Sequence, residues 1–256
     1  MVRAGIDIGS RTVKLVLMED GEIIQSQIVE NSFNPIEICQ GLLKKYKYDA
    51  ITATGYGRHL FARYFECDVI SEIKAFALGS RREISECRMV LDIGGQDTKA
   101  IALDDSGRMN KFEMNDRCAA GTGRFLEIMA MALGYSLQEF SRAATQAHKA
   151  EIINSMCTVF AESEIISLVA RGAAREEVAL GIHQAIVKRT AAMLQRVSIN
   201  REIAFVGGVA HNHCIRQLLE TSLGHPVIVP RNPQLIGALG CAINNGNGKI
   251  SRSGSE

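Results

Sequence analysis

The tripeptide Asp-Ile-Gly occurs twice in this chain, and a lysine follows each copy at the same distance. The first copy, DIGSRTVK, occupies residues 7–14, and the second, DIGGQDTK, occupies residues 92–99. An aspartate at a strand end followed by a glycine turn suits Mg-nucleotide binding. Backbone N–H groups beside glycine can approach phosphate oxygens, and the carboxylate can hold Mg²⁺ directly or through water. Two turns, one in each half of a duplicated chain, would therefore hold a nucleotide from both sides.

Two ordinary β-hairpins are the alternative explanation, because glycine-containing turns are common in hairpins. The shared register of the two copies favours the nucleotide site. A third glycine site, the pair Gly207-Gly208, follows the apolar run at residues 203–206. Glycines at a strand end let the backbone pass close to a flat ring or a ribose. This pair is weak evidence alone and gains weight only beside two phosphate-binding turns.

Cys118 and Cys157 differ from the other cysteines in their surroundings. Cys118 lies in a turn of small residues before an expected helix, and Cys157 lies where another expected helix begins. The positive end of a helix favours a thiolate, which suits metal ligation or redox chemistry. An iron–sulfur cluster held by thiolates alone needs four ligands, so a two-fold dimer would have to supply two from each subunit. Inert or unrelated cysteines are the alternative.

The other cysteines fit small buried hydrophobic residues without a partner motif. These are Cys39, Cys67, Cys87, Cys214 and Cys241.

Alternating strands and helices must position these residues. Apolar runs predict strands at residues 4–8, 13–18, 50–54, 89–93, 100–103, 203–206 and 227–229. Helical patterns occupy residues 35–45, 72–86, 123–133, 137–147, 158–170, 175–197 and 212–223, with a closing helix from residue 233. This order predicts an α/β protein of two related domains with a nucleotide cleft between them. We expect the first domain to comprise residues 1–87 and 233–256, and the second to comprise residues 88–232.

Composition narrows the functional classes. The chain has 256 residues, 46% of them hydrophobic, and a net charge of +1. It contains no basic block, which argues against nucleic-acid binding, and no long apolar run, which argues against a membrane span. Met1 leads directly into the first expected strand without a signal peptide, so we expect a cytoplasmic protein.

Together these motifs resemble the activator ATPases of 2-hydroxyacyl-CoA dehydratases, in the wider group that includes the ATP-binding subunits of benzoyl-CoA reductase. The resemblance spans nearly the whole chain, and the two cysteine motifs are its most specific part. The matching segments are residues 5–10, 53–58, 92–97, 114–125, 157–164 and 207–210. Arg11 departs from the family pattern, in which threonine is frequent, so a phosphate contact and a solvent-facing position both stay open for it.

The resemblance implies a duplicated actin/Hsp70/sugar-kinase-type fold that binds ATP and Mg²⁺. It also implies a homodimer with one 4Fe-4S cluster bridging the subunits through Cys118 and Cys157. Asp7 and Asp92 would hold Mg²⁺, directly or through water. The turns would contact the phosphates through Gly9, Ser10, Arg11, Thr12, Val13, Lys14, Gly94, Gly95 and Gln96, and the nucleoside would lie near Gly207, Gly208 and Gln234.

By the same resemblance, reduced ferredoxin or flavodoxin donates an electron, which ATP hydrolysis drives to a partner dehydratase or reductase. Asp7, Asp92 and Gln96 are the candidate catalytic residues. Gln96 either positions the attacking water, by analogy with glutamines in other phosphoryl-transfer enzymes, or only hydrogen-bonds the phosphate. A small-molecule kinase and a nucleotide-binding regulatory protein of the same fold are the rival functions, and neither explains the cysteine motifs.

Overall fold

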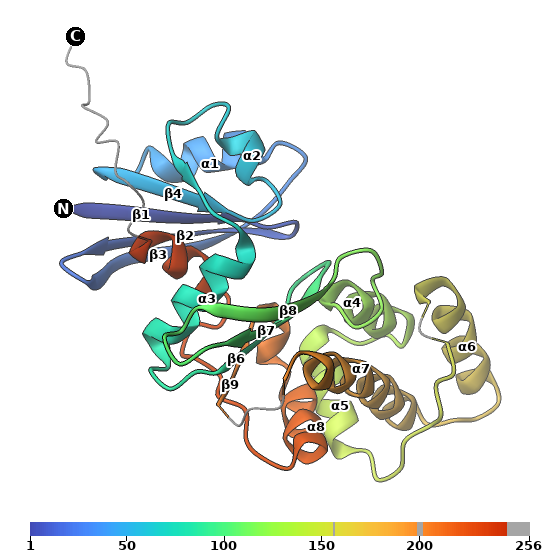
Figure 1. Ribbon diagram of the computed structural model, residues 1–256. Helices are drawn as coiled ribbons and strands as arrows, with labels where there is room; N and C mark the ends of the chain where they lie inside the picture. The colour runs from blue at the N-terminus through green and yellow to red at the C-terminus, as the bar shows by residue number, and fades with distance from the viewer. Residues whose placement is uncertain (156, 199–201, 245–256) are drawn as a thin grey trace. The chain divides into compact units, whose positions relative to one another are not determined.

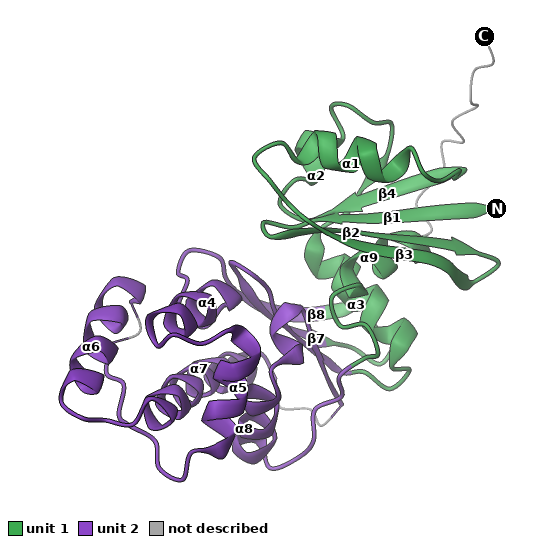
Figure 2. Cartoon of the chain, turned by 180° about the vertical axis from the view of Figure 1, so that it is seen from behind, with its two compact units in different colours: residues 1–87, 103–109, 230–256 green, residues 88–102, 110–229 purple. Residues whose placement is uncertain are grey.

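The computed structural model describes residues 1–155, 157–198 and 202–244 (Figure 1). The chain divides into two compact units (Figure 2). Unit 1 comprises residues 1–87, 103–109 and the described part of 230–256, and unit 2 comprises residues 88–102 and the described part of 110–229. No helix among the described residues is long and apolar enough to cross a membrane.

Unit 1 is built on a five-stranded sheet with the order β3-β2-β1-β4-β5. The strands are β1 (Val2–Ile8), β2 (Thr12–Glu19), β3 (Glu22–Glu30), β4 (Ala50–Thr54) and β5 (Asp68–Val69). The helices are α1 (Pro35–Leu43), α2 (Arg58–Phe61), α3 (Glu72–Glu83) and α9 (Ile236–Ile243). Helices α1 and α2 pack on one face of the sheet through Leu42 and Phe61, whereas α9 covers the other face and packs against α3.

Unit 2 repeats this plan with a four-stranded sheet of order β8-β7-β6-β9. The strands are β6 (Met89–Ile93), β7 (Thr98–Leu103), β8 (Met109–Asn115) and β9 (Ile203–Val206). The helices are α4 (Gly123–Ala132), α5 (Leu137–Gln146), α6 (Thr158–Ala170), α7 (Arg175–Val197) and α8 (His213–Leu223), with a 3₁₀ turn η1 (Gly208–His211). The main hydrophobic core lies between this sheet and α4, α5, α7 and α8.

Both copies of the Asp-Ile-Gly motif form the hairpins that the sequence predicts. Strands β1 and β2 are antiparallel and pair Asp7 with Lys14, and strands β6 and β7 pair Asp92 with Lys99 in the same way. Each aspartate strand also has a parallel neighbour, β4 for β1 and β9 for β6. The duplication therefore extends from the sequence motif to the pairing of three strands in each unit.

The structure also contains elements that the sequence patterns did not predict. Strands β3 and β8 are edge strands and largely exposed, so their hydrophobic alternation is too weak to signal a strand. Helix α2 and strand β5 are too short for periodicity to detect. The strand expected at residues 227–229 is wrong, because only an isolated bridge between Ala204 and Ile228 forms there. The closing helix begins at Ile236, after a turn, and α3 ends at Glu83.

A buried polar network around His183 ties three helices of unit 2 together. His183 Nδ1 lies 2.7 Å from the Ala179 carbonyl oxygen, and Asn212 Nδ2 lies 3.0 Å from His183 Nε2. Asn212 Oδ1 in turn accepts hydrogen bonds from Ser141 on α5 and from the Ile215 N–H of α8. A neutral imidazole satisfies both contacts, donating from Nδ1 and accepting at Nε2. Burial lowers the pKa of His183 to about 4, against the weaker opposing effect of the Ala179 hydrogen bond.

This burial predicts that unit 2 loses stability in mild acid. The unfolded histidine takes up a proton near pH 6.5, whereas the folded one stays neutral to about pH 4. Stability from His183 is therefore complete above pH 6.5 and falls as the pH drops to 4, by up to about 3 kcal/mol. Urea unfolding across this range tests the expectation, with His183→Gln as the comparison. The free energy of unfolding of the variant should decline less steeply with falling pH than that of the wild type. An equal decline in both proteins contradicts the expectation.

Candidate functional site

The first glycine turn joins β1 to β2 in unit 1. The Gly9 N–H donates to the Thr12 carbonyl oxygen at 3.1 Å, which closes the turn. Lys14 Nζ lies 3.1 Å from Oδ2 of the buried Asp7. Ser10 is half-buried and Arg11 is exposed. Val13 points into the hydrophobic core, so only its backbone is available to a ligand.

The second turn joins β6 to β7 in unit 2 and has the same hydrogen bond, from the Gly94 N–H to the Asp97 carbonyl oxygen at 2.9 Å. Lys99 Nζ contacts two carboxylates, Asp92 Oδ2 at 3.0 Å and Asp97 Oδ2 at 2.6 Å. All three of these side chains are buried. Gln96 is exposed on the turn, where its amide is accessible to a ligand or to water.

Behind each aspartate, the backbone of the neighbouring parallel strand approaches the carboxylate closely. Gly55 follows β4 with φ +90°, and Gly207 follows β9 with φ +85°. A Cβ atom on Gly55 would lie 2.5 Å from Asp7 Oδ1, and one on Gly207 would overlap Asp92 Oδ1. Only glycine adopts this conformation and leaves this space free. Gly55 is therefore the unit 1 counterpart of Gly207, which the matching strand-to-glycine spacing after residues 50–54 and 203–206 could have revealed.

The remaining residues expected near the nucleoside lie in different units. Gly207 is buried against Asp92, and the exposed Gly208 begins η1, so both belong to unit 2. Gln234 belongs to unit 1 and lies half-buried in the turn before α9. Asp7 and residues 9–14 also belong to unit 1, whereas Asp92, residues 94–96, Cys118 and Cys157 belong to unit 2.

Hydrogen bonds connect the second turn directly to the segment that carries Cys118. The N–H groups of Gly123 and Arg124, at the start of α4, donate to the Gly94 and Gly95 carbonyl oxygens at 2.9 and 2.8 Å. The buried Thr98 hydroxyl donates to the Gly121 carbonyl oxygen at 2.8 Å. A shift of the turn therefore acts on the loop before α4 without any intermediate element.

Side chains fix the Cys118 loop from within. Asn115 Nδ2 donates to the carbonyl oxygens of Cys118 and Ala120 at 2.9 and 3.1 Å, and the Thr122 hydroxyl donates to that of Ala119 at 2.6 Å. Cys118 is exposed and lies four residues before Thr122, the N-cap of α4. The loop thus holds an accessible thiol on a backbone whose carbonyl groups are satisfied.

Cys157 is the N-cap residue of α6 and is exposed, as its position in the sequence predicts. Glu164, two turns into this helix, reaches back to the segment before the cysteine. Its carboxylate accepts hydrogen bonds from the Asn154 N–H, the Asn154 amide and the Ser155 N–H at 2.8–3.0 Å. Burial raises the pKa of Glu164, but these hydrogen bonds outweigh it and lower the pKa overall. In sequence Glu164 is indistinguishable from a solvated helix residue, and no local signal marks this function.

The other five cysteines match the expectation of small hydrophobic residues. Cys39, Cys87, Cys214 and Cys241 are buried, and Cys67 is half-buried. Burial raises the pKa values of Cys39, Cys67 and Cys214 to about 11, with the charge of Asp68 adding to the effect at Cys67. These groups are therefore neutral thiols at physiological pH, unsuited to metal ligation.

Cys118 and Cys157 offer too few ligands for a cluster within one chain. Among the residues that the structure describes, no group of three or more histidine, cysteine, aspartate or glutamate side chains is arranged to hold a metal ion. Two exposed thiols on anchored segments, one at a helix N-terminus, are chemically suited to supply half of a four-thiolate site, which a second chain would have to complete.

Helix α6 exposes an unusual amount of apolar surface beside Cys157. Val159, Phe160 and Ile166 are exposed, whereas only Ala161 and Ile165 are buried. Several exposed large apolar side chains on one short helix are typical of a contact with another protein.

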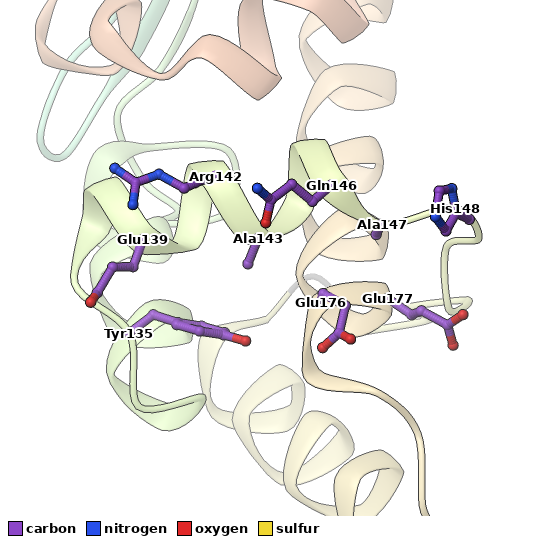
Figure 3. Close-up of a pocket in the computed structure, with 9 residues that line it drawn as sticks. All are labelled: Tyr135, Glu139, Arg142, Ala143, Gln146, Ala147, His148, Glu176 and Glu177. Atoms are coloured by element: carbon purple, nitrogen blue, oxygen red, sulfur yellow. The ribbon is translucent and has the colours of Figure 1, made fainter.

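A pocket elsewhere in unit 2 contains none of the expected site residues. It lies between α5 and the first turn of α7, and polar side chains such as Glu139, Arg142, His148 and Glu176 line it (Figure 3). The phosphate turns and the cysteine segments lie outside this pocket.

Known proteins resemble the chain over nearly its whole length. The model of the BadF/BadG/BcrA/BcrD ATPase family matches residues 4–244. The 2-hydroxyisocaproyl-CoA dehydratase activator of Clostridioides difficile is 38% identical over 95% of this chain and 94% of its own. The (R)-2-hydroxyglutaryl-CoA dehydratase activating ATPase of Acidaminococcus fermentans is 36% identical over 93% of this chain and 95% of its own.

Solved structures agree on the fold. The activator of the 2-hydroxyisocaproyl-CoA dehydratase from Clostridium difficile, with bound ADPNP, superimposes with a TM-score of 0.87 and 36% identity, covering 94% of this chain and 93% of its own. A ROK family glucokinase from Streptomyces griseus shares the fold alone, with a TM-score of 0.60 and 12% identity over 94% and 98% of the two chains. The expected duplicated actin-like ATPase fold and the family resemblance are confirmed, and the chain belongs to the BadF/BadG/BcrA/BcrD ATPase family.

Proposed function

We propose that this ATPase activates a 2-hydroxyacyl-CoA dehydratase, or a related acyl-CoA reductase, by passing it an electron. Cys118 and Cys157 of two copies of the chain would hold a 4Fe-4S cluster, which would supply the electron, and ATP hydrolysis drives the transfer. The hydrogen bonding between the second glycine turn and the Cys118 loop carries this proposal, because it links a nucleotide-binding turn to a cysteine proposed for electron transfer within one unit. The names of the two similar dehydratase activators support the choice of partner.

Mg-ATP is held by the two repeated turns. Residues 9–14 and 94–96 surround the phosphates, which accept hydrogen bonds from backbone N–H groups of the turns other than those of Gly9 and Gly94, which close the turns. Lys14 adds positive charge, and Asp7 and Asp92 hold Mg²⁺ directly or through water. Gly207, Gly208 and Gln234 lie near the nucleoside. The ADPNP bound to the similar solved structure supports this assignment. In hydrolysis, water attacks the γ-phosphorus, the bond to the β-phosphate oxygen breaks, and ADP and phosphate leave.

Cys118 and Cys157 bind the cluster as thiolates, two from each chain of a homodimer. The N-terminus of α6 favours the negative charge that the cluster would bring. Asn115, Thr122 and Glu164 hold the two cysteine segments in place. When bound, the cluster supplies one-electron chemistry at low potential.

Partners meet the chain on the surface beside the cysteines. Reduced ferredoxin or flavodoxin donates the electron, and the dehydratase or reductase accepts it. The exposed apolar side chains of α6 support protein contacts beside Cys157. We place this electron transfer in the cytoplasm. A small-molecule kinase or a nucleotide-binding regulatory protein of the same fold would leave the two exposed, anchored cysteines without a function.

Iron analysis tests the shared cluster. Protein purified without oxygen is expected to hold about four irons and four sulfides per dimer. Cys118→Ser and Cys157→Ser should each lose them, whereas Cys67→Ala, which alters a half-buried thiol, should keep them. A protein that hydrolyses ATP but stays iron-free after reconstitution would contradict the electron-transfer proposal and favour the rival functions.

Thr98 tests the link between the nucleotide and Cys118. Thr98→Val keeps the side-chain shape but removes the hydrogen bond to Gly121, at a stability loss of about 1 kcal/mol. We expect ATP to change the alkylation rate of Cys118 in the metal-free Cys157→Ser protein, and the valine variant to lose most of this change while still binding ATP. Thr98→Ser, which retains the hydroxyl, is the matched control. An unchanged nucleotide response in the valine variant argues against coupling through Thr98.

Substitution of Gln96 distinguishes a role in ATP hydrolysis from a role in ATP binding. If its amide positions the attacking water, Gln96→Ala should lower the rate of phosphate release about a hundredfold and leave the Kd for ATP within about threefold. If Gln96 only hydrogen-bonds the phosphate, the Kd should rise instead. Single-turnover hydrolysis and equilibrium binding of a non-hydrolysable analogue distinguish these outcomes, with Gln96→Glu as a variant of similar size.

A further inference from the structure

We propose that the two lysines of the repeated motif have separate tasks in the proposed ATP site. Lys14 meets the phosphates, whereas Lys99 is a positioning residue that holds the carboxylates of the second turn and never contacts the nucleotide. The sequence motif alone treats the two lysines as equivalent, and the structure distinguishes them by their surroundings.

One of the sequence differences between the two turns adds a carboxylate to the second turn. Adding the offset between Asp7 and Asp92 aligns Gly9 with Gly94 and Lys14 with Lys99. In the same alignment, Asp97 of the second turn is equivalent to Thr12 of the first. Strand pairing agrees, because each lysine lies directly across its hairpin from the motif aspartate. The second turn therefore has one more carboxylate than the first on an otherwise equivalent backbone.

In the first turn, the lysine ammonium lies directly over the turn. A Cβ atom built on Gly9 would have Lys14 Nζ as its nearest neighbour, at 2.9 Å. Lys14 has one carboxylate partner, Asp7 at 3.1 Å, and its side chain keeps 14% of its surface exposed. This ammonium is therefore close to the glycine backbone that faces the phosphates and remains accessible to an incoming anion.

In the second turn, a carboxylate occupies the corresponding position. A Cβ atom built on Gly94 would have Asp97 Oδ1 as its nearest neighbour, at 2.6 Å. Lys99 bridges Asp97 and Asp92 at 2.6 and 3.0 Å, and only 2% of its side chain is exposed. The first turn thus presents positive charge over its leading glycine, whereas the second presents negative charge there.

The electrostatics of burial keep Lys99 in place. Moving its ammonium toward a phosphate would leave two buried carboxylates without their shared counter-ion, which is strongly unfavourable in a low-dielectric interior. Moving the Lys14 ammonium would leave only the Asp7 carboxylate without its partner, and solvent can reach the Lys14 side chain. Lys99 therefore holds the carboxylate of Asp92, the proposed Mg²⁺-holding residue, in its orientation, and only Lys14 is available for the phosphates.

Variants that change the charge of the buried group test whether Lys99 serves only as the counter-ion of Asp92 and Asp97. Lys99→Met leaves the buried group with two carboxylates, whereas Asp97→Asn/Lys99→Met restores the net charge of the wild type. We would measure the Kd for Mg-ADPNP by calorimetry, with the thermal midpoint recorded for each variant. Lys99→Met should weaken binding at least tenfold, and the double variant should return to within about threefold of wild type. A folded double variant that binds as weakly as Lys99→Met overturns the inference.

Three further variants test the inference if Lys99→Met does not fold. Lys14→Met should weaken binding at least tenfold, and adding Asp97→Asn should not restore it. Asp97→Asn alone removes one of the two carboxylate contacts of Lys99, and tighter binding in this variant that is lost again in Asp97→Asn/Lys99→Met would identify Lys99 as a phosphate ligand and overturn the inference. The inference rests on the proposed ATP site. A wild-type chain that binds no nucleotide contradicts the proposed function itself, whereas binding without rescue contradicts only the role of Lys99.

Discussion

A buried aspartate paired with a lysine across a hairpin is the interaction on which each unit depends. Charges are placed inside a protein only when a partner and hydrogen bonds compensate for the loss of water. Lys14 compensates Asp7, and Lys99 compensates Asp92 together with Asp97. The backbone must also make room, and glycine with positive φ at residues 55 and 207 provides it. The hairpin, the parallel neighbour strand and the glycine after it thus form one structural motif, which occurs once in each unit.

The second copy is connected directly to the loop that carries Cys118. Its turn accepts hydrogen bonds from the start of α4, and Thr98 donates to the loop that carries Cys118. Short, direct bonds of this kind make the position of the loop depend on the position of the turn. A ligand that moves the turn can therefore change the environment of an exposed thiol without a long path through the core.

Packing differs sharply between the helices of unit 2. Helix α7 is anchored by many buried residues, and His183 links it to α5 and α8 through a satisfied polar network. Helix α6 buries only Ala161 and Ile165 and is held near its start by Glu164. Elements with few buried contacts open and shift more readily than the core. The unit therefore combines a rigid scaffold with a weakly packed helix at the cysteine that faces outward.

The sequence by itself determined the two hairpins, the bounds of α6, α7 and β9 and the α/β class, because periodicity and glycine turns are local signals. The family and its actin-like fold followed from the resemblance that the motifs carry together. It also singled out Cys118 and Cys157 from cysteines that proved buried or half-buried. Only the tertiary structure distinguished Lys14 from Lys99, assigned Gly207 to the Asp92 carboxylate and showed Glu164 beneath the Cys157 segment. Spacing along a chain carries no information about which polar groups meet after distant strands and helices pack, since those contacts depend on burial and direction in three dimensions.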